Sequence, residues 1–88
     1  MIEFYTDECT VCRWMDANTY KDPDVVQEAR NFVPVKLNAN KNLRLAMLAN
    51  IDAFPTIVWM DSKGNERKRI VGKYEPAELV SEMQAARS

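Results

Sequence analysis

The sequence predicts an α/β fold, a minimal βαβαββα arrangement in which a four-stranded mixed sheet carries helices on both faces. Short apolar runs alternate along the chain with stretches of helical spacing. A helical stretch separates the first two predicted strands, which implies that they pair in parallel. The tight turn at residues 61–65 joins the last two, which implies a hairpin. The length of 88 residues predicts a single domain over residues 1–88.

The first half of the chain contains two predicted strands with helical pieces between them. Residues 1–5 are short, apolar and aromatic, as in a buried strand, and residues 12–19 have the pattern of a helix. Asp22 can cap a second helical piece, and Pro23 suits its first position. In residues 32–38 apolar and polar side chains alternate, which predicts the second strand.

The second half begins with a compact apolar helix at residues 43–49. Asn50 follows it, and asparagine tolerates the left-handed conformation that ends helices. Residues 56–60 form the third predicted strand. Residues 66–71 form a more polar fourth strand, expected near an edge of the sheet. Pro76 opens the last helix, whose apolar positions repeat at helical spacing: Leu79, Val80, Met83 and Ala86.

The charge and hydrophobicity of the sequence narrow the kinds of partner and location that it can be expected to have. Twelve basic and thirteen acidic residues give a formal charge of −1, so no electrostatic feature favours nucleic acid or an anionic membrane. The longest apolar run, residues 45–49, is far too short to be a membrane segment. No signal peptide is recognisable, which favours a cytoplasmic location; a periplasmic or other extracytoplasmic one is expected if the chain is a domain of a longer precursor.

The only two cysteines, Cys9 and Cys12, form a Cys-x-x-Cys pair between the first strand and the helical stretch. A thiol at the N-terminus of a helix faces unpaired N–H groups and the positive end of the helix dipole, which favour its thiolate. This predicts a redox dithiol in which Cys9 is the nucleophile and Cys12 resolves the mixed disulfide. Thr10 and Val11, between them, are expected to tune the reduction potential and to contact substrate.

Two other interpretations of the cysteine pair are a metal site and a purely structural disulfide. A closed zinc site needs about four N or S ligands, and the chain has two cysteines and no histidine. No metal is therefore expected within one chain, although a metal or cluster shared by two chains remains an alternative. A structural staple across so short a loop would constrain little of the unfolded chain. The expected cofactor is none beyond the redox-active disulfide itself.

Several motifs resemble those of thioredoxins over nearly the whole chain. Residues 2–5 followed by Cys9 resemble the strand that leads to the family's active site, where an acidic residue stands six positions before the first cysteine. That residue is Glu3 here. Residues 35–38 resemble the next core strand, with Lys36 at the position of a family lysine. The resemblance implies that Glu3 relays a proton for Cys12 and that Lys36 modulates the site. From the sequence alone, Glu3 could also be an outward-facing strand residue, and a lone lysine such as Lys36 is more often at the surface than in a site.

The resemblance also assigns a substrate-binding region. Phe54 and Pro55, followed by Thr56, resemble the family's cis-proline loop, and Gly72 resembles a glycine close to the active site. A cis peptide after Phe54 would present backbone groups to an extended substrate. Residues 12–16 and 22–25 are closest to thioredoxin-like domains related to the C-terminal domain of the bacterial membrane disulfide-transfer reductase.

The chain departs from the family pattern in two ways. Glu8 replaces the usual tryptophan before the first cysteine, and the usual first strand and helix are missing. The strand at residues 32–38 should therefore be an uncovered edge, and Pro34 within it agrees with an edge position. An uncovered edge predicts either a homodimer through this strand or further chain before Met1.

The predicted function is thiol–disulfide exchange with disulfide-containing protein substrates. No Gly-x-Gly-x-x-Gly fingerprint occurs, since the only glycines are Gly64 and Gly72. Electrons are therefore expected from a separate reductase or thiol donor. The alternative is a binding module for an extended peptide or a partner domain, without redox turnover.

Overall fold

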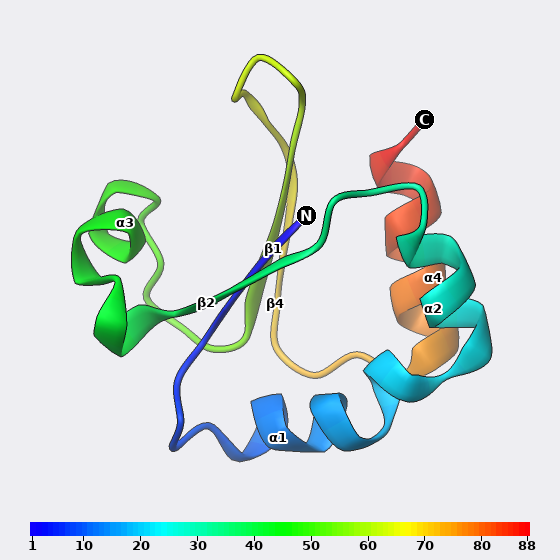
Figure 1. Ribbon diagram of the computed structural model, residues 1–88, viewed down its shortest axis with the longest axis horizontal. Helices are drawn as coiled ribbons and strands as arrows, with labels where there is room; N and C mark the ends of the chain where they lie inside the picture. The colour runs from blue at the N-terminus through cyan, green and yellow to red at the C-terminus, as the bar shows by residue number, and fades with distance from the viewer.

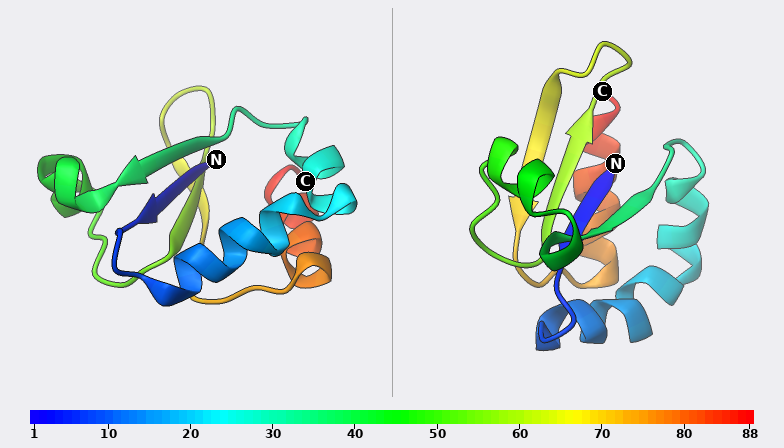
Figure 2. Two further views of the ribbon diagram at one scale, coloured as in Figure 1. Left: turned by 60° about the horizontal axis from the view of Figure 1, so that its bottom comes forward. Right: turned by 60° about the vertical axis from the view of Figure 1, so that its left-hand side comes forward.

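The computed structural model describes residues 1–88 and confirms the predicted fold class. The strands β1 (Ile2–Tyr5), β2 (Val35–Asn38), β3 (Thr56–Met60) and β4 (Glu66–Val71) form one sheet in the order β2-β1-β3-β4, as the right panel of Figure 2 shows. The β1–β2 pair is parallel, and the β1–β3 and β3–β4 pairs are antiparallel. Both β2 and β4 are therefore edges, as the sequence predicted.

Helices cover both faces of this sheet. The helices α1 (Thr10–Ala17), α2 (Pro23–Ala29) and α4 (Pro76–Ala86) lie on one side, and α3 (Leu43–Leu48) lies alone on the other (Figure 1). Two short 3₁₀ turns connect these elements: Thr19–Lys21 and Ala39–Lys41. None of the helices has the length and apolar character needed to cross a membrane.

The sheet separates two hydrophobic clusters of unequal size, because successive strand residues point to opposite faces. Ile57 and Trp59 face the three-helix side, and Val58 between them faces α3. The larger cluster also contains buried residues of α1, α2, β4 and α4: Met15, Val25, Ile70, Leu79, Met83 and Ala86. The smaller one adds Phe4, Ala39 and Ala46 to Val58.

Helix-end predictions from the sequence are confirmed. The Asp22 carboxylate accepts hydrogen bonds from the N–H groups of Asp24 at 2.9 Å and Val25 at 3.4 Å. Asn50 has a φ of 56°, and the Ile51 N–H donates to the Ala46 carbonyl at 2.9 Å. That pattern closes the last turn of α3 and satisfies carbonyls that would otherwise lack partners.

Arg69 on β4 secures the end of α3 against the sheet. Its guanidinium donates to the carbonyl oxygens of Ala49 at 2.7 Å and Asn50 at 3.2 Å, and it pairs with Glu66. Since no other side chain of β4 reaches these carbonyls, Arg69 provides the polar link between α3 and the edge of the sheet.

The predicted bounds of two elements were wrong. The first helix begins at Thr10 rather than at residue 12, because Cys9 acts as its N-cap; it ends at Ala17, after which the chain turns through Thr19–Lys21. The second strand begins at Val35 rather than at residue 32. Phe32 packs against Trp59 with ring centroids 6.4 Å apart, so it belongs to the larger cluster.

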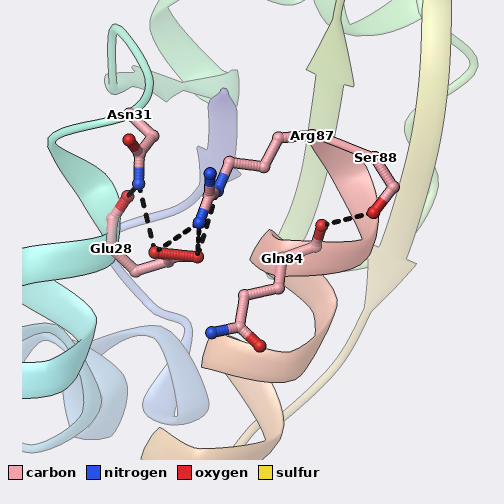
Figure 3. A network of polar contacts seen from close by, with 5 residues as sticks. All are labelled: Glu28, Asn31, Gln84, Arg87 and Ser88. Carbon is pink, nitrogen blue, oxygen red and sulfur yellow. Dashed lines mark hydrogen bonds and ion pairs between the residues drawn. The ribbon is translucent and has the colours of Figure 1, made fainter.

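A polar network joins α2 to the end of α4, as Figure 3 shows. Arg87 pairs with the nearly buried carboxylate of Glu28 at 3.1 Å, and Asn31 donates to the same carboxylate at 3.1 Å. At the chain end the Ser88 hydroxyl donates to the Gln84 carbonyl at 3.0 Å. Burial of a carboxylate is tolerated because donors satisfy it.

We expect the substitution Arg87→Gln to lower the free energy of unfolding by about 1–3 kcal/mol, because it leaves the Glu28 carboxylate with Asn31 as its remaining side-chain donor. The double variant Glu28→Gln/Arg87→Gln should recover part of that loss. Urea denaturation followed by circular dichroism measures both. Equal stability of Arg87→Gln and the parent chain would show that the network contributes nothing.

Candidate active site

The two cysteines form a disulfide at the N-terminus of α1, with their Cα atoms 5.2 Å apart. Cys9 is the N-cap, and its sulfur accepts a hydrogen bond from the Cys12 N–H at 3.1 Å. A side chain in this position receives the unpaired N–H groups of the first turn. The helix end thus stabilises negative charge on the Cys9 sulfur when the disulfide is reduced.

The two sulfur-bearing residues differ in accessibility. Cys9 is partly exposed, whereas Cys12 is only 2% exposed and lies against the body of the protein. The residues between them form the outer turn: Thr10 is exposed and Val11 is half-buried against the larger cluster. No group of three or more His, Cys, Asp or Glu side chains is placed to hold a metal ion.

The loop between β1 and Cys9 is fixed by two hydrogen bonds to Asp7. The Arg13 guanidinium of α1 donates to the Asp7 carbonyl. The Asp7 carboxylate accepts from the Asn38 amide at the end of β2, at 3.2 Å. Since Asn38 is 8% exposed, this contact anchors the loop to the interior of the sheet.

Strand register brings three loops to one end of the sheet. Phe4 of β1 lies opposite Thr56 of β3, which lies opposite Val71 of β4. The chain therefore leaves β1, enters β3 and leaves β4 at the same end, the lower one in the right panel of Figure 2. The residues that precede β3 and follow β4, Phe54–Pro55 and Gly72, thus lie at the end of the sheet that leads to Cys9.

The two predicted substrate-binding loops contact each other. The Phe54–Pro55 peptide is cis, as predicted. The Gly72 N–H donates to the Pro55 carbonyl at 2.9 Å, and Gly72 has a φ of 99°, a conformation that favours glycine. The next residue, Lys73, places its ammonium 4.0 Å from the ring centroid of Trp14 on α1. These contacts connect the loops at this end of the sheet to the helix of the disulfide.

Glu3 points into the protein on the α1 side and is 4% exposed. Its Oε1 lies 3.8 Å from the Lys36 ammonium, while its Oε2 is buried without a hydrogen-bond partner. Lys36 makes its shorter contact, 2.7 Å, with Asp16 of α1, and its ammonium also lies 4.9 Å from the Tyr5 ring centroid. Asp16, rather than Glu3, is therefore the main ionic partner of Lys36.

This arrangement shifts two ionisation equilibria. Burial raises the pKa of Glu3 from 4.5 to about 7; the charge of Lys36 opposes the rise, and Asp16 adds to it. Burial and the nearby Glu3 charge raise the pKa of Tyr20 above its ordinary value. Glu3 can consequently gain and lose a proton near neutral pH.

Lys36 links Glu3 to the face of α1 that carries Cys12. Asp16 comes four residues after Cys12, so the two side chains share one face of the helix. Lys36 contacts both Asp16 and Glu3, so the Glu3 carboxylate lies near Asp16, which is one helical turn after Cys12 on α1. The sequence did not indicate that Asp16 and Tyr20 belong to this group, although the four-residue spacing from Cys12 was a usable signal for Asp16.

Comparisons with known proteins agree with this geometry. A family model described as a thioredoxin-like domain matches residues 1–87. The thiol:disulfide interchange protein DsbD of Haemophilus influenzae (strain PittEE) is 32% identical over 78 residues, covering 82% of this chain and 14% of that protein. The chloroplastic thioredoxin-like protein HCF164 of Arabidopsis thaliana is 28% identical over 85 residues, covering 97% of this chain and 33% of that protein. The chain thus spans only a minor part of the length of these two relatives.

Solved structures show the same fold. A thioredoxin from Thermus thermophilus superimposes with a TM-score of 0.84 at 23% identity, covering 96% of this chain and 69% of that one. The reduced C-terminal domain of DsbD from Neisseria meningitidis gives a TM-score of 0.72 at 25% identity, with 97% and 77% covered.

Proposed function

The chain belongs to the thioredoxin-like family, and from that membership we propose that it is a thiol–disulfide oxidoreductase that exchanges disulfides with protein substrates. The observation that carries the proposal is the Cys9–Cys12 disulfide at the N-terminus of α1, with the Cys12 N–H donating to the Cys9 sulfur. This is the environment in which a cysteine becomes a stable thiolate and a good nucleophile.

The exchange proceeds in two steps. In the reduced protein the Cys9 thiolate attacks one sulfur of a client disulfide, forming a mixed disulfide and releasing the other client sulfur as a thiolate. The Cys12 thiol then loses its proton and attacks the Cys9 sulfur, which releases the second client thiolate. The client gains two electrons, and Cys9 and Cys12 end as the disulfide seen in the structure.

Glu3 is the proposed proton acceptor for Cys12. It shares the Lys36 ammonium with Asp16, which is one helical turn after Cys12 on α1, and its pKa of about 7 suits proton transfer near neutrality. Lys36, held by Asp16, modulates this acidity through its charge. Because the unpartnered Oε2 of Glu3 is buried, a proton can pass between Cys12 and Glu3 away from bulk water, with an intervening water as carrier.

The client would bind across the end of the sheet. Phe54, Pro55 and Gly72 lie there, beside the turn of exposed Thr10 and half-buried Val11; the Phe54 backbone groups and the Gly72 carbonyl are not used by the hydrogen bond between Gly72 and Pro55. An extended segment of the client can pair with such groups while its disulfide approaches Cys9. Reduction of the protein itself requires a separate reductase or thiol donor. We propose a cytoplasmic location for this chain, as the sequence analysis favours. The relative HCF164 is named as chloroplastic.

The test is reduction of insulin by the purified protein with dithiothreitol as the electron donor, followed by turbidity. We expect a rate clearly above that of dithiothreitol alone, with the double variant Cys9→Ser/Cys12→Ser at the background rate. A parent chain that also stays at background, yet binds unfolded polypeptide, would favour a binding module without redox turnover.

A further inference from the structure

A cavity of about 510 Å³ between the sheet and the helices α1 and α2 is lined by every group that sets the acidity of Glu3. Five of its eleven lining residues have ionisable side chains: Glu3, Asp16, Tyr20, Lys21 and Lys36. The other six are hydrophobic. In the exchange proposed for this protein, Glu3 accepts a proton and Lys36, held by Asp16, adjusts its acidity. Tyr20, whose hydroxyl is buried, has no part in it so far.

The 3₁₀ turn Thr19–Lys21 fixes the position of Tyr20. Thr19 is fully buried, and its hydroxyl donates to the Tyr74 carbonyl at 2.8 Å. The Asp22 N–H donates to the Thr19 carbonyl at 3.2 Å, which closes the turn. The Tyr20 ring packs against the larger cluster, and its hydroxyl is buried. Because its neighbours hold the turn, the hydroxyl has a defined place beside Glu3.

The Tyr20 hydroxyl is the donor available to the Glu3 carboxylate. The Lys36 ammonium is 3.8 Å from Glu3 Oε1, which is beyond hydrogen-bond distance, and it contacts Asp16 at 2.7 Å. Tyr20 acts on Glu3 as a side-chain hydrogen-bond partner, and neither Glu3 Oε2 nor the Tyr20 hydroxyl has any other partner. A carboxylate that is 4% exposed needs such a donor once it has lost its proton.

The charges in the cavity keep Tyr20 in its donor form. Burial raises the pKa of Glu3 to about 7, and the charge of Asp16 adds to this rise. Lys36 and the Tyr20 hydroxyl oppose it, because a positive charge and a hydrogen-bond donor both stabilise the carboxylate. Burial and the Glu3 charge raise the pKa of Tyr20. The phenol therefore keeps its proton over the whole range in which Glu3 titrates.

We propose that Tyr20 is a positioning residue for disulfide exchange: its hydroxyl donates to the Glu3 carboxylate and stabilises the ionised form that accepts the Cys12 proton. This assignment rests on the proposed function, because it concerns the step that resolves the mixed disulfide. The proton passes from the Cys12 sulfur to the Glu3 carboxylate, and Tyr20 keeps its own proton throughout. Without the hydroxyl, Glu3 holds its proton more tightly and is a weaker acceptor near neutral pH.

The substitution Tyr20→Phe removes the hydroxyl and keeps the ring that packs in the larger cluster. We expect it to raise the pKa of Glu3, measured by carboxyl ¹³C NMR of the oxidised protein, by roughly one pH unit. The matched control is Tyr74→Phe, the same change on another partly buried tyrosine of that cluster, which should leave the Glu3 titration unchanged. This readout needs no turnover, so it is independent of whether the protein reduces insulin. An unchanged pKa of Glu3 in Tyr20→Phe would overturn the proposal.

Kinetics then separates the two steps of exchange. With an equimolar aromatic disulfide such as DTNB, the reduced protein releases one coloured thiolate when Cys9 attacks and a second when Cys12 resolves the mixed disulfide. Tyr20→Phe should leave the first release close to that of the parent. It should slow the second roughly fivefold at pH 7 and move its pH midpoint upward with the pKa of Glu3.

A double variant shows whether Tyr20 acts through Glu3. In the Glu3→Gln protein, Tyr20→Phe should slow the second release no further, because the hydroxyl has no carboxylate to stabilise. Equal slowing of both releases by Tyr20→Phe, or the same slowing in the Glu3→Gln protein, would indicate a purely structural role and overturn the proposal.

A measurement on the parent protein tests the same contact if Tyr20→Phe does not fold. The chain has three tyrosines, so the ring carbons that bear the hydroxyl groups can be labelled with ¹³C and resolved by NMR. The Tyr20 signal should shift with the same pH midpoint as the Glu3 carboxyl, and the Tyr74 signal should not follow it. A Tyr20 signal that stays constant while Glu3 titrates would overturn the proposal.

Discussion

Replacing Cys9 by serine should reduce disulfide reduction to the background rate. A serine hydroxyl at the N-terminus of α1 would accept the Cys12 N–H as the sulfur does, so the fold should persist. It cannot become an anion near neutral pH or form a mixed disulfide, and the first step of exchange is lost. Insulin reduction measures the activity, and circular dichroism verifies that the variant is folded.

Cys12→Ser should behave differently, because Cys9 can still attack a client. The mixed disulfide then has no resolving thiol and accumulates, and non-reducing electrophoresis with mass spectrometry should detect the adduct. The contrast between a 2%-exposed Cys12 and a partly exposed Cys9 is the structural reason for this order. If Cys9→Ser accumulated the mixed disulfide instead and Cys12→Ser did not, the assignment of nucleophile and resolving cysteine would be reversed.

The second large effect concerns Glu3 and pH. Its pKa rises from 4.5 in the unfolded chain to about 7 in the folded protein, so the folded state binds the extra proton. The stability that Glu3 contributes is fully present below pH 4.5 and is lost as pH rises through about 7. At about 1.4 kcal/mol per pKa unit, the total loss is on the order of 3 kcal/mol above that range.

Glu3→Gln should remove this slope, since glutamine does not ionise. The variant should be more stable than the parent at pH 8, by up to about 3 kcal/mol, and the difference should shrink toward pH 4. Urea denaturation between pH 4 and pH 8 measures it. The same variant should slow release of the mixed disulfide, because Cys12 loses its proton acceptor. Parallel stability profiles for parent and variant would exclude Glu3 from both roles.

Much of the fold could be predicted because its signals are local. The Asp22 cap and the left-handed Asn50 follow from the side chain at one position, and both are confirmed. The start of α1 was missed because cysteine is an unusual cap. The start of β2 was missed because Phe32 packs on Trp59, which is distant in sequence. Contacts of that kind override the local alternation on which the strand prediction rested.

The candidate site divides in the same way. The disulfide between Cys9 and Cys12 and the cis peptide at Pro55 could be predicted from local motifs and family resemblance. The preference of the Lys36 ammonium for Asp16 over Glu3 could not be predicted, because it depends on ångström differences in the distances between α1 and two strands. The catalytic roles of Cys9, Cys12 and Glu3 and the substrate contacts of the loops stay predictions until the variants are measured.

The single helix on one face of the sheet has a consequence for how the molecule opens. The six-residue α3 covers a small cluster, leaves Leu43, Met47 and Leu48 more than 60% exposed, and is linked to β4 by Arg69. The disulfide belongs to the opposite layer, with its three helices and larger cluster. Local unfolding begins where buried contacts are few. The α3 layer can therefore fray and re-form as a separate unit, and the geometry around the sulfurs persists through that fluctuation.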